Sequence, residues 1–178
     1  MEREKEEKEL KESHYLKGPF IENNNISFVK REKDGLIIKM EGQDKHLNGY
    51  GIFHGGIFFM LADTAAGLLL IDDGKESVTL QGSMNFIDNT KGGIIYAHAK
   101  YVSSGIKNNI IEVKISDKNK KLLAIGTFNF YRVNIKALKR KFDVKEKECQ
   151  WRHSFFNILL KTLQYNLLNF HDHLNLRL

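Results

Sequence analysis

Residues 46–74 read HLNGYGIFHGGIFFMLADTAAGLLLIDDG, and this stretch decides the fold. After a short loop, we expect a helix that begins at His54-Gly55-Gly56 and ends at Asp72-Asp73-Gly74, where Gly74 suits a C-terminal cap. Almost every side chain between these ends is apolar. A helix that is apolar on all sides is usually buried by the rest of its protein, so the sequence predicts one central core helix.

A membrane span is the alternative for such an apolar run. The run covers only about 15–18 residues, whereas a span needs about 20. Asp63 lies at its centre, and a charged side chain in the middle of a bilayer is costly. We therefore assign the run to a globular core and expect no membrane span.

Asp63 is the residue that a simple core helix does not explain. An ionised carboxylate in apolar surroundings is costly unless it is paired, and its pKa rises. Asp63 is therefore either a structural carboxylate that bonds a buried backbone group or a Lys, or a functional group. The residues alone leave both interpretations open.

The two glycines at the helix start offer a complementary feature. Their backbone N–H groups are not covered by side chains, and together with the positive end of the helix dipole they suit an oxyanion. Gly55 and Asp63 are eight residues apart, which is about 12 Å along a helix. One helix cannot easily bring both groups to one carbonyl, but two antiparallel copies can. This spacing predicts a two-fold dimer with composite sites.

The pattern N-x-x-G-x-x-H-G-G-x-x-x-x-L-A-D runs from Asn48 to Asp63. It resembles the signature of hotdog-fold acyl-CoA thioesterases, in particular the phenylacetyl-CoA and 4-hydroxybenzoyl-CoA branch. The resemblance covers roughly residues 20–133. It implies an α+β fold in which an antiparallel sheet of about six strands wraps around one long central helix, with active sites shared across a dimer.

The resemblance also implies roles for individual residues. Asp63 would be the nucleophile or general base, and the Gly55 N–H would polarise the thioester carbonyl. Asn48 and His54 would position the acyl group and the loop. Gly56 would be among the substrate-binding residues.

Two further positions bear on the expected site. Gly67, one turn after Asp63, has no side chain, whereas some relatives carry a hydroxyl there that helps to hold substrate or water. This departure affects the expected rate and acyl preference, not the fold. Thr79 lies in the next predicted strand, which in relatives sometimes supplies a hydroxyl. We expect Thr79 to hold the attacking water, and the alternative is an ordinary strand threonine.

The rest of the domain has the alternating pattern of β-strands. Strands are predicted at 26–29, 36–40, 78–86, 94–102, 110–116 and 122–132. Short connections predict that strands adjacent in sequence pair with each other. In the third of these strands, one face is predicted to hold Val78, Leu80, Gly82, Met84 and Phe86.

Composition divides the 178 residues into three parts. We expect a charged arm at 1–18, the thioesterase domain at 19–133 and a basic extension at 134–178. The extension holds nine Lys/Arg and four Asp/Glu, so it carries +5 of the net charge of +6. The domain itself is nearly neutral, and nucleic-acid binding is therefore not expected from the overall charge. Residues 154–170 have apolar side chains at helical spacing and predict an amphipathic helix.

Other classes of protein have little support. The single Cys149 excludes an internal disulfide, and the charged first residues, MEREKEEKEL, do not resemble a secretory leader, so we expect a cytoplasmic protein. The sequence contains no G-x-S-x-G motif and no nucleotide-binding glycine fingerprint. His171 and His173 are weak evidence for a metal. We expect neither a cofactor nor a metal.

The leading hypothesis is hydrolysis of acyl-CoA thioesters to free acid and CoA, by a homodimer or a dimer of dimers. The alternative, from a different class, is a non-catalytic acyl-CoA sensor whose basic tail contacts a partner or nucleic acid. The sequence does not identify the acyl group, because its apolar side chains suit aryl and aliphatic groups equally.

Overall fold

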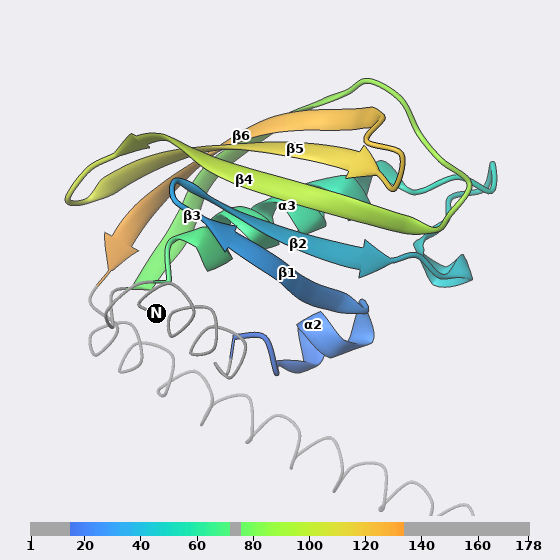
Figure 1. Ribbon diagram of the computed structural model, residues 1–178, viewed down its shortest axis with the longest axis horizontal. Helices are drawn as coiled ribbons and strands as arrows, with labels where there is room; N and C mark the ends of the chain where they lie inside the picture. Colours follow the sequence, from blue (N-terminus) through green and yellow to red (C-terminus); the bar gives the residue numbers. More distant parts are fainter. Residues whose placement is uncertain (1–14, 72–75, 134–178) are drawn as a thin grey trace, which may run out of the picture. The chain divides into compact units, whose positions relative to one another are not determined.

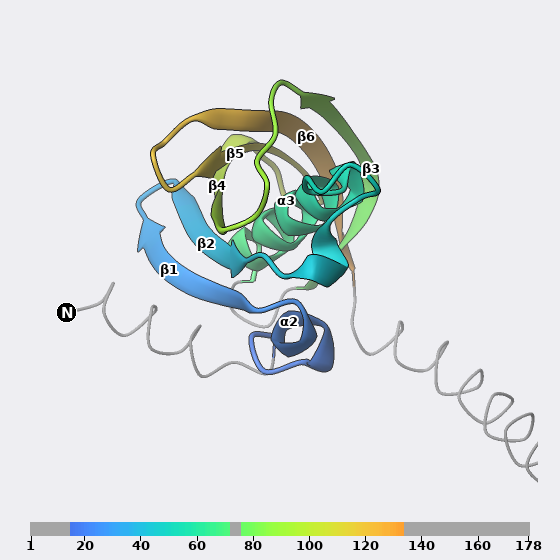
Figure 2. The same cartoon turned by 90° about the vertical axis from the view of Figure 1, so that its right-hand side faces the viewer.

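The computed structural model describes residues 15–71 and 76–133. In this part of the chain a six-stranded antiparallel sheet curves around helix α3 (Gly55–Leu69), as Figure 1 shows. In Figure 2 the helix crosses the view obliquely, with the sheet curling around it. The predicted α+β architecture, one long helix inside a sheet of six strands, is confirmed.

In residues 15–71 and 76–133, eight further elements accompany this helix. The short helix α2 (Pro19–Asn23) precedes the sheet, and the 3₁₀ turn η1 (Asp44–His46) leads into the loop before α3. The strands are β1 (Ile26–Glu32), β2 (Gly35–Glu41), β3 (Glu76–Phe86), β4 (Ile94–Ser104), β5 (Asn108–Asp117) and β6 (Leu122–Val133). The predicted arm at 1–18 is described only from residue 15, and the predicted extension at 134–178 lies outside the described residues.

The strand order corrects the expectation of sequential pairing. The order across the sheet is β1-β2-β4-β5-β6-β3, so β3 pairs with β6 and not with β4. Helix α3 follows β2 in the sequence and crosses the inner face of the sheet. The next strand, β3, therefore lies at the far edge of the sheet. Residues 87–93 then bring the chain back to β4, which pairs with β2. The connection through α3 thus places β3 at an edge.

The limits of α3 differ from the prediction at one end. His54 is the N-cap, as the glycine-rich start indicated. The helix ends at Leu69, earlier than the predicted Asp72-Asp73-Gly74. There the Leu70 N–H bonds the Gly67 carbonyl 3.1 Å away, the tighter pattern of a closing helical turn. The predicted cap at Gly74 lies outside the described residues.

Helix α3 is not buried on all sides, which corrects the expectation of a fully wrapped helix. Seven of its residues are buried against the sheet: Phe58, Leu61, Ala62, Ala65, Ala66, Leu68 and Leu69. A stripe of more exposed residues remains, which we call the open stripe: Gly56, Phe59, Met60, Asp63, Thr64 and Gly67. Their spacing of three and four places them on one face of the helix. Asp63 lies on this face.

A β-bulge at Leu80 interrupts β3. The pairing with β6 passes from Thr79↔Phe130 directly to Gln81↔Asn129, so Leu80 has no partner. A bulge adds one residue to one strand and changes which side chains face which side. Leu80 is 62% exposed.

The bulge overturns the predicted face of β3. Phe128 and Phe130 of β6 are buried on the inner side of the sheet. Thr79 pairs with Phe130 before the bulge and Gly82 pairs with Phe128 after it, so both face inward. The prediction that Leu80 shares a face with Gly82 is wrong, because strict alternation takes no account of an inserted residue.

The inward-facing glycines lead to a packing prediction. A Cβ on Gly82 would lie 2.7 Å from Cε1 of Phe128 and 2.8 Å from Cζ of Phe59. We expect Gly82→Ala to lower the free energy of unfolding by about 1–3 kcal/mol, because both rings must shift. Gly67→Ala is the matched control, since its Cβ would meet Phe130 at an ordinary 3.8 Å. It should raise stability by about 1 kcal/mol through helix propensity. Urea unfolding measures both, and equal stabilities of the two variants would contradict the packing described here.

Candidate active site

The structure brings Asp63 and Thr79 together. Asp63 projects from the open stripe of α3, and Thr79 faces inward from β3 just before the bulge. The Thr79 hydroxyl donates a hydrogen bond of 2.8 Å to Oδ1 of Asp63. The bulge matters here, because an unbroken alternation that placed Leu80 inward would turn Thr79 away from the helix. The contact predicted for Thr79 with the Asp63 site is therefore present.

An open pocket of about 280 Å³ reaches this pair. It lies along the second half of α3, between the helix, strands β3 and β6 and the segment before α2. Its walls are mainly apolar, and they include Asp63, Gly67, Ser77, Thr79, Phe130 and Tyr15. This volume is near the lower end of the range for small-molecule pockets. Asp63 therefore has both a scaffold bond and access to a cavity.

Burial sets the proton affinity of Asp63. Desolvation by the surrounding apolar groups raises the pKa of the Asp63 carboxyl above its ordinary value of 3.8. The hydrogen bond from Thr79 opposes this effect, because it stabilises the charged form. A carboxylate with a raised pKa is a better proton acceptor than an exposed one, which suits a general base.

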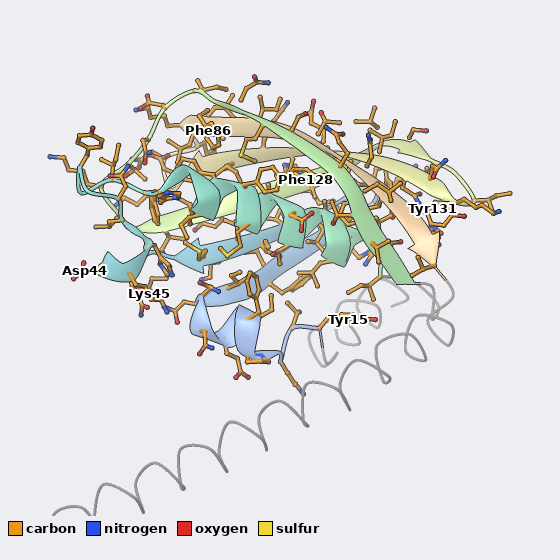
Figure 3. All side chains as sticks on the ribbon, turned by 180° about the vertical axis from the view of Figure 1, so that it is seen from behind. Tyr15, Asp44, Lys45, Phe86, Phe128 and Tyr131 are labelled. Carbon is orange, nitrogen blue, oxygen red and sulfur yellow. The ribbon has the colours of Figure 1, made fainter. Side chains whose placement is uncertain are left out.

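The start of α3 presents one open donor. Nδ1 of His54 accepts a hydrogen bond of 2.9 Å from the Gly56 N–H, so the Gly56 amide is occupied by the helix cap. Within residues 15–71 and 76–133, the Gly55 N–H has no acceptor. The aromatic ring of Phe86 borders Gly55, 3.3 Å from where its Cβ would be. Figure 3 shows Phe86 beside the start of α3.

The side chain of Asn48 organises the loop before the helix. Its Oδ1 accepts hydrogen bonds from the Tyr50 N–H at 2.9 Å and from the Ile52 N–H at 3.4 Å. Asn48 and His54 both lie at the Gly55 end of α3, whereas Asp63 and Thr79 lie about two turns further along. The predicted site residues thus form two groups within one chain.

Two residues near the site, His46 and Ser77, were assigned no role from the sequence. His46 is 2% exposed; its Nδ1 accepts from the Gln43 N–H at 3.0 Å, and its carbonyl accepts from the His54 N–H at 2.9 Å. It therefore ties η1 to the helix cap. Burial lowers the pKa of His46. Ser77 lines the pocket, and strict alternation does predict that it shares a face with Thr79.

Metal sites and membrane-spanning helices were also considered in the sequence, and the described residues offer neither. The described residues contain no group of three His, Cys, Asp or Glu placed to hold a metal ion. The weak candidates His171 and His173 lie outside that part of the chain. Among the described helices, none is long and apolar enough to cross a membrane.

Comparisons with known proteins agree with this geometry. A family model described as Thioesterase superfamily matches residues 50–124. The 1,4-dihydroxy-2-naphthoyl-CoA hydrolase of Listeria monocytogenes is 28% identical over 108 residues, 59% of this chain and 88% of that protein. A Streptococcus mutans structure bound to acetyl CoA is 33% identical, with a TM-score of 0.58, and the match covers 62% of this chain and 90% of that one. The Escherichia coli PaaI protein from the phenylacetic acid degradation operon has a TM-score of 0.64 at 21% identity, over 68% of this chain and 88% of that one.

A helix that starts with glycines, wrapped by an antiparallel sheet with an acidic residue in a cavity, defines a hotdog-fold protein of the thioesterase type. The chain belongs to the thioesterase superfamily. The resemblance seen in residues 48–63 is thereby confirmed. The likeness to the PaaI structure shows the shared fold.

The raised pKa of Asp63 makes a prediction about stability. The folded state takes up a proton at Asp63 more readily than the unfolded chain does. Stability therefore falls as pH rises from about 3.8 through the folded-state pKa, and the full penalty is present above it. Asp63→Asn removes the charge, so at about pH 7 the variant should unfold a few degrees higher than the natural chain.

Thermal unfolding at neutral and acidic pH measures this difference. Near pH 3, where the carboxyl is protonated in both states, the two proteins should unfold at similar temperatures. A variant with a lower Tm at neutral pH would show that the charge of Asp63 is favourably paired in the folded protein.

Proposed function

We propose that the protein hydrolyses acyl-CoA thioesters to a free acid and CoA, in composite sites that join two copies of the chain. The observation that carries the proposal is Asp63, a partly buried carboxylate with a raised pKa, at the wall of an apolar pocket in a thioesterase fold. The N–H of Gly55 from the second copy completes each site.

Three features support a two-fold partner. The separation of about 12 Å between Gly55 and Asp63 is too long for one helix to serve a single carbonyl. The open stripe leaves one face of α3 without cover from its own sheet. Strand β3 is an edge strand, and it exposes Leu80 and Phe86, with 62% and 57% of their surfaces accessible. A second copy that runs antiparallel along α3 and β3 covers these surfaces and brings Gly55 opposite Asp63.

The chemistry follows from the two groups. The Gly55 N–H donates to the thioester carbonyl oxygen and stabilises the negative charge that develops there. Asp63 either attacks the carbonyl carbon or takes a proton from a water molecule that attacks it. In both routes the carbon–sulfur bond breaks, the electron pair leaves with the CoA thiolate, and water supplies the hydroxyl of the acid. Thr79 orients the Asp63 carboxylate and holds the water.

The first test replaces the carboxylate. Asp63→Asn should lower kcat by at least about a hundredfold, because the amide can neither attack nor accept the proton. A free-thiol assay with a panel of acyl-CoAs measures this loss, and sedimentation should show an unchanged oligomer. Asp44→Asn, at an exposed position in η1, is the control and should keep full activity. Full activity in Asp63→Asn would defeat the mechanism, whereas tight binding without turnover in the natural chain would identify an acyl-CoA sensor.

A second test removes a single N–H from the backbone. Gly55 is the first helical residue, a position where proline fits, and the preceding His54 has the extended backbone that a proline prefers. Gly55→Pro therefore deletes the proposed oxyanion donor with little cost to the helix. It should lower kcat about a hundredfold. Gly55→Ala keeps the N–H and adds the same Cβ beside Phe86, so it isolates the effect of the donor. Equal losses in both variants would assign the effect to the Phe86 contact instead.

Mixed dimers test the composite nature of the sites. In a dimer of one Gly55→Pro copy and one Asp63→Asn copy, one site carries both changes and the other carries neither. Co-expression with two affinity tags should therefore yield mixed dimers with about half of the natural activity. Inactive mixed dimers would place each site within one subunit.

The hydrogen bond from Thr79 predicts a pH effect. Because this bond favours the charged form of Asp63, Thr79→Val should raise the pKa of Asp63 further. The acidic limb of the kcat/KM profile should then move to higher pH, in addition to any loss of rate. Thr127→Val, at an exposed strand position, is the control. An acidic limb that stays in place would show that Thr79 does not act on the reacting carboxylate.

A further inference from the structure

Buried polar atoms without partners gather at one corner of the sheet. Four side-chain atoms in the described residues are buried without a hydrogen-bond partner, and three of them are Oγ of Ser77, Nδ2 of Asn109 and Nε of Arg132. These three residues come from β3, β5 and β6, which are neighbours in the sheet. We call this group the polar corner. Each such atom loses its hydrogen bonds to water on folding, so three together call for an explanation.

The strand register places the three side chains on one face. Ser77 pairs directly with Arg132 across β3 and β6, and Asn109 pairs with Phe130 across β5 and β6. Arg132 is two residues beyond Phe130, so alternation gives both the same inward direction. Phe130 is 3% exposed and Asn109 is fully buried, which fixes this direction toward the helix.

The chemistry of the polar corner favours a negatively charged acceptor. The Nε of Arg132 and the Nδ2 of Asn109 can only donate hydrogen bonds, and the hydroxyl of Ser77 can donate. Oδ1 of Asn109 already accepts from the Ser104 hydroxyl at 3.3 Å, which leaves the amide nitrogen for another partner. Within residues 15–71 and 76–133, the Arg132 guanidinium forms no ion pair. A carboxylate offers the acceptor oxygens and the opposite charge that this group lacks.

The polar corner adjoins the pocket that contains Asp63. Ser77 belongs to both, because it lines the pocket and pairs with Arg132. Ser77 and Thr79 face the same way on β3, two residues and therefore about 7 Å apart. The pocket wall near them is apolar and includes Leu70 and Ile71. Figure 3 shows Tyr15 of the pocket wall near the later part of α3.

We propose that the polar corner of Ser77, Asn109 and Arg132 binds a carboxylate at the far end of the acyl group, so that the substrates are thioesters of short dicarboxylic acids. This inference rests on the proposed function, since the thioester carbonyl is placed at Asp63 and Thr79. The methylene chain then lies along the apolar wall between the two ends. The separation of about 7 Å between Ser77 and Thr79 along β3 is the distance that the acyl group must span. It favours a chain of a few methylenes over a long fatty acyl chain.

The test compares glutaryl-CoA with its apolar isostere, in which an isopropyl group replaces the terminal carboxylate. The natural chain should hydrolyse glutaryl-CoA with the higher kcat/KM. Arg132→Gln should lower kcat/KM for glutaryl-CoA by at least about tenfold and leave the isostere unchanged or improved, because only the carboxylate loses its partner. Ser77→Ala should show a smaller loss with the same selectivity. Lys100→Gln, at an exposed strand position, is the charge-matched control and should alter neither substrate.

Equilibrium binding to the Asp63→Asn variant separates this inference from the proposed function. Tighter binding of glutaryl-CoA than of the isostere, lost in the Asp63→Asn, Arg132→Gln double variant, supports the carboxylate site even if the natural chain hydrolyses neither compound. Equal binding of the two compounds, or equal losses for both when Arg132 is changed, overturns the inference. Hydrolysis of the isostere in preference to glutaryl-CoA also overturns it, while the thioesterase proposal stands.

Discussion

The central constraint is a carboxylate on a helix that is otherwise almost entirely apolar. Asp63 loses part of its hydration when the sheet closes around α3, and the bond from Thr79 restores only some of that loss. The sheet of one copy leaves one face of the helix uncovered, and the open stripe and the pocket lie on that face beside Asp63. A partly buried carboxylate with a raised pKa, an incompletely covered helix and a cavity are thus three aspects of one arrangement.

The sequence predicted those parts of the fold and of the site that depend on local chemistry. His54 and Gly55 mark the start of α3 because capping and glycine backbone are properties of a few adjacent residues. Asp63 stood out as the single charge in an apolar run. The end of the helix, the place of β3 at the edge and the inward turn of Thr79 depend on contacts between distant segments. Neither the bulge at Leu80 nor the strand order has a signal in the alternation of apolar residues.

The loop before α3 shows how the same residue types serve structure and chemistry. The Gly56 N–H donates to Nδ1 of His54, and Oδ1 of Asn48 accepts from backbone N–H groups of its own loop. Within residues 15–71 and 76–133, these bonds leave the Gly55 N–H as a donor without an acceptor at the helix start. In the proposed reaction, a donor held in place by such a loop would stabilise the developing charge at little cost of reorganisation.

The extra residue at Leu80 divides β3 into two segments whose inward-facing residues differ in chemistry. Upstream of Leu80, the inward positions hold hydroxyl groups that face the cavity. Downstream, they hold Gly82, which lies against the rings of Phe128 and Phe59, and Met84, which packs against the core. The upstream segment contacts the cavity and the downstream segment contacts the aromatic core. Substitutions at the upstream positions can therefore occur without disturbing the packing of the downstream positions. A single inserted residue thus separates the positions that set the polarity of the cavity from the positions that keep the core packed.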